Sequence, residues 1–247
     1  MTKPLGVFLL AAVLAAFSWP VSAQPDEREA IIGTVARVSQ SVGALYAQQE
    51  GGDIRFLCSA TAVAREGDAT VILTAKHCLE KGVSYLINFG DNRLRSLNAW
   101  QVPHYEVDPG KYPRVYNEPQ TDMALFLMPG TDIPLVNMAV TSKDLRPGAK
   151  VVMVGYPLGL SKISYEGIVA GRLNRLGSDY YDYLLLQIFG APGSSGSAVI
   201  NVETGKVIGV LVAGKGGVAG LPVIFATPIE YREHLMEVAP GGAASAK

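Results

Sequence analysis

The sequence has few of the residues that build metal centres, and neither sign of charge is in excess. Its 247 residues include 2 cysteines and 3 histidines, and 21 lysine and arginine residues stand against 22 aspartate and glutamate residues. These scattered ligands form no cluster with zinc spacing, so we expect no metal and no cofactor. The near-zero net charge offers no attraction to nucleic acid, which we do not expect as a partner.

Apolar runs long enough to span a membrane are also lacking. The N-terminal run from Leu5 to Phe17 has 13 residues, whereas a membrane-spanning helix needs about 20. It is followed by Val21-Ser22-Ala23, whose small residues suit signal peptidase. We therefore predict a signal peptide over residues 1–23, with an uncleaved membrane anchor as the alternative. The mature protein is then exported, either periplasmic or secreted, and does not stay inserted in a membrane.

With only Cys58 and Cys78 present, at most one disulfide can form within the chain. An exported chain meets an oxidising compartment, where an even pair of cysteines can become a disulfide. We expect this bridge. Two buried thiols are the alternative, because the sequence shows neither the distance between the cysteines nor their geometry.

Glycine, proline, aspartate and asparagine break most of the chain into short β-rich runs. In the first half these runs are 42–47, 54–64, 69–75, 84–89, 98–102 and 123–128. In the second half they are 150–154, 167–172, 183–189, 197–201, 206–212 and 223–227. Such spacing favours a sandwich or a barrel over βαβ units.

A turn-rich stretch over residues 129–148 separates the two sets of runs. We predict an all-β fold of two consecutive six-stranded antiparallel β-barrels, over about 41–128 and 149–230. A short C-terminal helix is expected over 231–238, where apolar and charged residues fall on opposite sides.

Two flanking segments complete the predicted organisation. We expect residues 24–40 to form a helical N-terminal segment and residues 239–247 to form a disordered tail.

Three short motifs carry candidate chemistry. Thr74-Ala75-Lys76-His77-Cys78 follows an apolar run and places a histidine at a strand end, where a rigid sheet can aim an imidazole into a cleft. Thr121-Asp122-Met123-Ala124-Leu125 places an aspartate at the entry to an apolar strand. A histidine beside a cysteine is more often structural, and most such aspartates cap turns, so neither motif is decisive alone.

The third motif is Gly193-Ser194-Ser195-Gly196-Ser197. Its glycines allow a tight turn that can point the N–H groups of Gly193 and Ser195 at one developing oxyanion. A flexible glycine-serine turn is the simpler interpretation of this segment taken alone. It is not an α/β-hydrolase elbow, because Ser195 lacks a glycine two residues later.

Taken together, in the order His, Asp, Ser, the motifs resemble those of the trypsin-like serine protease superfamily, which has the chymotrypsin fold. They are similar to that family's Thr-Ala-Ala-His-Cys, Asp-Ile-Ala-Leu and Gly-Asp-Ser-Gly-Gly. The resemblance implies a protease domain over residues 41–238 that acts on proteins or peptides. It also implies a triad of His77, Asp122 and Ser195, and an oxyanion hole made by Gly193 and Ser195.

Further matches lean towards bacterial branches of the superfamily. Residues 155–159, 207–210 and 225–229 resemble segments of the high-temperature-requirement proteases, whereas 193–198 equally resembles glutamyl endopeptidases. Both branches stay open, and no oligomeric state is predicted. The resemblance also implies that a Cys58–Cys78 bridge helps to hold the catalytic histidine.

Several positions depart from the family pattern. Ser194 replaces the aspartate that pairs with a freed N-terminus in digestive members, so we expect activity without a zymogen cut. Ser197 and Ala198 replace glycine and proline, which leaves the geometry of the loop open. Inactive relatives exist in this superfamily, so a peptide-binding homologue without activity is the main alternative, and an esterase is a third.

The resemblance places the substrate pocket at Phe189 and at Leu211, Val212 and Ala213. Phe189 stands where trypsins have an aspartate, so we do not expect a basic P1 residue, and small or apolar P1 side chains are favoured.

Other candidates for the same catalytic roles are weaker. His104 and His234 are expected at the surface. Asp182 is the main rival to Asp122 as the group that orients His77.

Overall fold

The computed structural model describes residues 26–101, 122–176, 179–212 and 223–232. The predicted signal peptide, His104, His234, Ala213 and the predicted tail therefore lie outside the described residues.

An α-helix precedes the barrels. Helix α1 (Glu27–Ser39) begins at Asp26, whose side chain accepts a hydrogen bond from the Arg28 N–H at 3.1 Å. This caps a free N–H of the first turn, where acidic residues also suit the helix dipole. Thr34 and Val38 are buried, so the helix is fixed by one side against the barrels.

Six strands form the first closed antiparallel barrel, in the order β1-β2-β3-β6-β5-β4. They are β1 (Val42–Gln48), β2 (Ile54–Glu66), β3 (Ala69–Thr74), β4 (Ser84–Asn88), β5 (Arg95–Gln101) and β6 (Ala124–Pro129). Gly67 adopts a positive φ of 55° in the two-residue turn that joins β2 to β3, a conformation that glycine takes at little cost. Leu45, Ile72 and Phe126 are fully buried in its core.

Six further strands form the second closed antiparallel barrel. They are β7 (Lys150–Gly155), β8 (Ile163–Leu176), β9 (Asp179–Gln187), β10 (Ala198–Asn201), β11 (Val207–Val212) and β12 (Ile224–Pro228). Their order around the barrel is β7-β8-β9-β12-β11-β10, which repeats the order of the first barrel. The predicted fold class of two six-stranded antiparallel barrels is confirmed.

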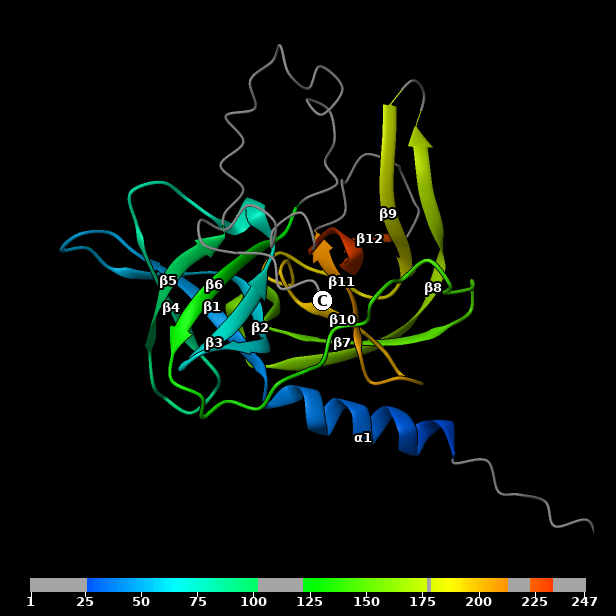
Figure 1. Ribbon diagram of the computed structural model, residues 1–247, viewed down its shortest axis with the longest axis horizontal. Coiled ribbons are helices and arrows are strands. Elements are labelled where there is room, and N and C mark those ends of the chain that lie inside the picture. The colour runs from blue at the N-terminus through cyan, green and yellow to red at the C-terminus, as the bar shows by residue number, and fades with distance from the viewer. Residues whose placement is uncertain (1–25, 102–121, 177–178, 213–222, 233–247) are drawn as a thin grey trace, which may run out of the picture.

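The two barrels lie side by side, with α1 next to β7 (Figure 1). One buried apolar cluster contains residues of both barrels, including Leu45 and Ile72 from the first and Val154 and Ile200 from the second. The junction between them is thus a continuous core, which holds loops of one barrel in fixed positions against the other.

At the C-terminal end of the described chain, one 3₁₀ turn covers Ile229–Tyr231 and follows β12 directly. Most of the helix predicted over residues 231–238 lies outside the described residues.

Candidate active site

His77 lies in a single 3₁₀ turn (Lys76–Cys78) that follows β3. The turn is closed by hydrogen bonds from the Cys78 N–H to the Ala75 carbonyl and from the Leu79 N–H to the Lys76 carbonyl. The His77 side chain is 44% exposed, so its ring can be reached from solvent. The turn that follows β3 therefore presents the imidazole where solvent can reach it.

Asp122 reaches His77 because of the register between two strands. Thr74 at the end of β3 pairs with Ala124 at the start of β6, so the residues just beyond these ends meet. One carboxylate oxygen of Asp122 accepts from the His77 backbone N–H at 2.8 Å. The other lies 2.6 Å from His77 Nδ1. Two contacts to one carboxylate fix both the position of the main chain and the orientation of the ring.

This carboxylate sets the protonation of the imidazole. The side-chain hydrogen bond to Asp122 raises the pKa of His77 above its usual value, and partial burial opposes the rise. When the Nδ1–H group donates a hydrogen bond to Asp122, the neutral ring carries its lone pair on Nε2. His77 then has the tautomer that a general base needs.

Asp182, the alternative candidate for orienting His77, contacts other residues. It forms an ion pair with Arg172, and its carboxylate accepts from the Tyr231 hydroxyl at 2.9 Å. Arg172 also pairs with Glu230 at 2.6 Å. This polar network lies within the second barrel, so Asp122, and not Asp182, contacts His77.

Ser195 lies in a tightly turned loop before β10. The Ser194 N–H donates to the Ala191 carbonyl at 2.9 Å, and the Ser197 N–H donates to the Ser194 carbonyl at 3.1 Å. Gly193 and Gly196 have φ values of 88° and 82°, which side chains with a Cβ rarely adopt. The loop is therefore a defined double turn rather than a flexible glycine-serine linker.

The first barrel clamps this loop through Ser59 of β2, a residue that the sequence analysis missed. The Ser59 N–H donates to the Ser195 carbonyl at 2.9 Å. Its hydroxyl donates to the Gly193 carbonyl and accepts from the Tyr156 N–H, both at 2.9 Å. Ser59 is fully buried, so these bonds are shielded from water. Its position directly after Cys58 is the one signal in the sequence that could have drawn attention to it.

A second clamp orients the peptide between Pro192 and Gly193. The Leu158 N–H donates to the Pro192 carbonyl at 2.6 Å, and Leu158 itself has a left-handed φ of 56°. Because a trans peptide is planar, the Gly193 N–H points opposite to that carbonyl. Among the described residues, neither the Gly193 N–H nor the Ser195 N–H donates a hydrogen bond. Within the described part of the chain, both donors are thus available to a ligand.

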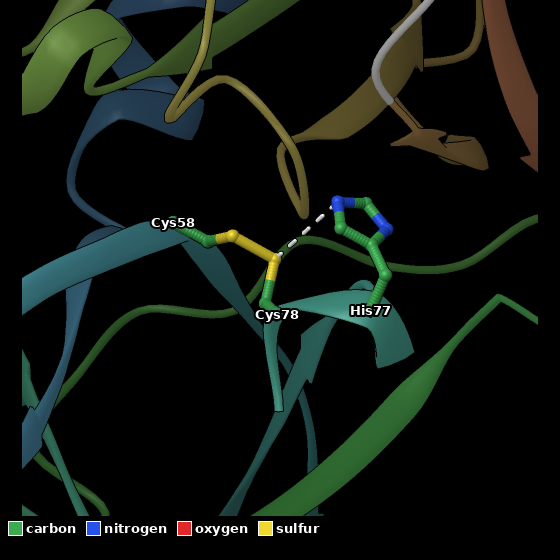
Figure 2. A group of neighbouring side chains, drawn as sticks. All are labelled: Cys58, His77 and Cys78. Carbon is green, nitrogen blue, oxygen red and sulfur yellow. Dashed lines mark hydrogen bonds between the residues drawn. A yellow bond between two sulfur atoms is a disulfide. The ribbon is translucent and has the colours of Figure 1, made fainter. Parts of the chain in front are cut away.

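The predicted Cys58–Cys78 disulfide is confirmed, with 6.2 Å between the two Cα atoms. It joins β2 to the turn that carries His77. His77 Nε2 faces this bridge, 3.9 Å from Cys78 Sγ (Figure 2). Within the described part of the chain, no hydrogen bond joins His77 to Ser195, whose side chain lies in the buried loop and is 4% exposed as a residue.

The predicted pocket residues differ in exposure. Leu211 and Val212 are buried on β11, and the Leu211 carbonyl accepts from the Gly196 N–H at 2.9 Å. Leu211 therefore lies directly behind the loop of Ser195. Phe189 is 59% exposed and packs its ring against Tyr165, with centroids 4.9 Å apart. The role of Phe189 in a substrate pocket stays a prediction.

One group of metal-ligating side chains is present at the site. Ligand atoms of Cys58, His77 and Cys78 lie within 4.8 Å of one another. The two sulfurs are bonded to each other, so in this state neither is a thiolate that could bind a metal.

Comparison with known proteins matches the chain to one protein family and to relatives that are described as serine endoproteases. The model of a trypsin-like peptidase domain matches residues 58–210. A probable periplasmic serine endoprotease of the DegP-like type from Marinomonas sp. (strain MWYL1) is 34% identical over 118 residues, which are 46% of this chain and 24% of that protein. A protein of the same description from Halomonas elongata is 27% identical over 188 residues, 74% of this chain and 35% of its own length.

Two solved structures have a similar fold. The HtrA-type protease AlgW with a tripeptide has a TM-score of 0.64 and 22% identity, and the match covers 86% of this chain and 63% of AlgW. The Rv3671c protease from M. tuberculosis in its active form has a TM-score of 0.65 and 16% identity, with 91% of each chain covered. The chain thus spans only about a quarter to a third of the curated relatives, but nearly all of one solved structure.

A separate finding concerns membranes. Across the described residues, no helix combines the length and the apolar character that a membrane crossing requires.

Proposed function

The chain belongs to the trypsin-like peptidase family, and from this premise we propose that it is an exported serine endopeptidase that uses His77, Asp122 and Ser195. The observation that carries the proposal is the pair of contacts between Asp122 and His77. They prepare an imidazole with a free lone pair at the end of a rigid strand, as general base catalysis requires.

In the proposed reaction, His77 Nε2 takes the proton from Ser195 Oγ as this oxygen attacks the carbonyl carbon of a peptide bond. Asp122 stabilises the imidazolium that forms. His77 then gives the proton to the leaving amine, which departs and leaves an acyl group on Ser195. Water, deprotonated by His77, releases the acid product and restores the serine.

The tetrahedral intermediate carries a negative oxygen that needs donors. The N–H groups of Gly193 and Ser195 are free in the described structure, and the clamps from Ser59 and Leu158 hold the loop that bears them. One such donor contributes roughly 3 kcal/mol to the stability of the transition state. These two N–H groups are our proposed oxyanion hole.

Substrate choice follows from the residues behind the loop. Leu211 and Val212 are apolar and buried, so they offer no counter-charge to a charged P1 side chain. We propose small or apolar P1 residues. Curated relatives are named periplasmic, which supports export, directed by residues 1–23.

A second candidate function is peptide binding without cleavage. It is favoured by the orientation of His77 Nε2, which faces Cys78 Sγ and makes no hydrogen bond to Ser195 among the described residues. In an active enzyme the imidazole and the hydroxyl must approach to about 3 Å, although this bond often tightens only when substrate binds.

A peptide-library digest separates the two functions. We expect the purified chain to cleave after small or apolar residues, and Ser195→Ala to remove cleavage while still binding peptides. Ser84→Ala, at an exposed position on β4, is the matched control and should cleave like the natural chain. Peptide binding without cleavage by the folded natural chain would establish the second function instead, and turnover of simple esters alone would indicate an esterase.

A further inference from the structure

The cluster of Cys58, Cys78 and His77 has the composition of a zinc site once the disulfide is reduced. Two thiolates and one imidazole are ligands that zinc prefers, and a set of Cys₂His with a water is a known type of open zinc site. The three side chains come from β2 and from the turn after β3, and Figure 2 shows His77 Nε2 directed at Cys78 Sγ. Their ligand atoms already lie within 4.8 Å of one another.

The distances suit tetrahedral coordination. With zinc bonds of about 2.3 Å to sulfur and 2.0 Å to nitrogen, ligand sulfur and nitrogen atoms lie about 3.5 Å apart, and two sulfurs about 3.8 Å apart. The distance from His77 Nε2 to Cys78 Sγ is 3.9 Å. The Cα atoms of the two cysteines are 6.2 Å apart, so rotation of the freed side chains can separate the sulfurs without a shift of the main chain.

Asp122 completes the arrangement from the other side of the ring. Histidines that bind zinc usually donate their second ring N–H to a carboxylate, which fixes the tautomer and orients the ring. Asp122 Oδ2 lies 2.6 Å from His77 Nδ1 and fills this place. The lone pair on Nε2 is thereby directed at the sulfurs.

The balance of charges also favours binding of a zinc ion between the reduced cysteines. Cys58 and Cys78 are both buried, and burying two thiolates without a counter-charge is costly. A divalent cation between two thiolates and a neutral imidazole gives a group with no net charge. His77 is 44% exposed, so the ion has a path from solvent.

We propose that reduction of the Cys58–Cys78 disulfide creates a zinc site that takes His77 as its third protein ligand. A dithiol reductant supplies two electrons and two protons to the disulfide and closes into its own disulfide. Zinc then displaces the two thiol protons to solvent and binds both sulfurs, while Nε2 adds through its lone pair without losing a proton. A water fills the fourth position.

The consequence for activity rests on the proposed function. Nε2 cannot accept the proton of Ser195 while its lone pair is bound to zinc. The reduced, zinc-bound chain is therefore inactive, and removal of zinc by a chelator restores the base. The disulfide thus keeps His77 from binding zinc. Loss of activity requires both a reductant and zinc.

The test measures metal binding directly, on the full chain. The oxidised chain, the dithiol-reduced chain and a reduced chain alkylated with iodoacetamide are freed of reagent without air and titrated with Zn²⁺ or Co²⁺. We expect one metal ion per reduced chain, with a thiolate-to-cobalt absorption band, and none in the oxidised or alkylated forms. A reduced chain that keeps its far-ultraviolet circular dichroism and binds no metal would overturn the proposal.

Variants identify the histidine ligand. His77→Ala should weaken zinc binding by at least about 10-fold, and Asp122→Asn, which keeps the ring, by about 10- to 100-fold. Ser84→Ala is the control and should bind zinc like the natural chain. Unchanged affinity in both His77→Ala and Asp122→Asn would exclude His77 as a ligand and overturn the proposal.

Reactivity is measured separately with a fluorophosphonate. We expect zinc to abolish labelling of the reduced chain and a chelator to restore it. A chain that is unlabelled in every state refutes the proposed function, while metal stoichiometry still decides the zinc site. Labelling that persists with stoichiometric zinc bound contradicts the proposed inhibition.

Discussion

The two barrels have the same strand order but build their halves of the candidate site differently. In the first barrel, the register of β3 with β6 is enough to bring Asp122 to His77. In the second, the loop of Ser195 depends on bonds from outside its own turn, above all from Ser59 of the first barrel. The proposed base and the aspartate that orients it are thus held by sheet pairing, and the proposed nucleophile and oxyanion donors are held by clamps.

The largest loss of activity is expected from a substitution in the first barrel. Asp122→Asn keeps the shape of the side chain but no longer fixes the productive tautomer of His77. We expect kcat to fall by about 10⁴-fold, with little change in KM. Rates on an optimised peptide measure this, and Ser84→Ala is the control. A loss below about 10-fold would show that Asp122 does not orient the base.

The second-largest effect is expected at the proposed oxyanion hole, in the loop of Ser195. A Cβ added at Gly193 would lie 2.7 Å from Phe56 Cε1 and 2.7 Å from the Tyr156 carbonyl, at a φ of 88°. Gly193→Ala should therefore displace one donor and lower kcat by about 10²- to 10³-fold. The matched control is Gly171→Ala, because a Cβ there meets nothing within 4 Å. Equal activity of the two variants would refute the role assigned to Gly193.

Ser59→Ala tests the clamp between the barrels. It leaves the Gly193 carbonyl and the Tyr156 N–H without their buried partner, which costs about 1–3 kcal/mol of unfolding free energy. We expect kcat and the rate of fluorophosphonate labelling to fall about 10-fold, while the downfield NMR resonance of the His77 Nδ1 proton stays in place. Ser59→Thr keeps the hydroxyl and should recover part of the rate. A shifted resonance would show that the two halves are not independent.

The smallest effect is a shift in pH dependence. The hydrogen bond to Asp122 raises the pKa of His77, and His77 can act as the proposed base only when its ring is neutral. With the disulfide intact, kcat/KM should therefore rise with pH through a midpoint above 6.5. The residual activity of Asp122→Asn should have a lower midpoint, because the carboxylate no longer stabilises the imidazolium. A midpoint that is unchanged or higher in Asp122→Asn would contradict this account.

Local sequence signals were sufficient to predict the fold class and to select the candidate site residues. Turn residues and β-branched runs predict twelve strands in two sets, and the structure has six strands in each of two barrels. The Cys58–Cys78 bridge was also predictable. These features depend on residues close in the sequence or on a single possible pairing.

Long-range geometry was not predictable. The bond from the Ser59 hydroxyl to the Gly193 carbonyl joins residues 134 positions apart, and the position of Ser59 directly after Cys58 does not indicate this partner. The left-handed φ of Leu158 is unusual for a residue with a Cβ. Phe189, which follows the end of β9, packs against Tyr165 of β8. These three features depend on how the two barrels and their strands pack against each other. The spacing of motifs along the sequence carries no information about that packing.

The central claim is that Ser195 is a nucleophile activated by His77. The most direct measurement is incubation of the oxidised chain with a fluorophosphonate, followed by peptide mapping by mass spectrometry. The account predicts one adduct per chain, on Ser195, which is absent from Ser195→Ala and strongly slowed in His77→Ala. A correctly folded natural chain that forms no adduct on Ser195 would contradict it.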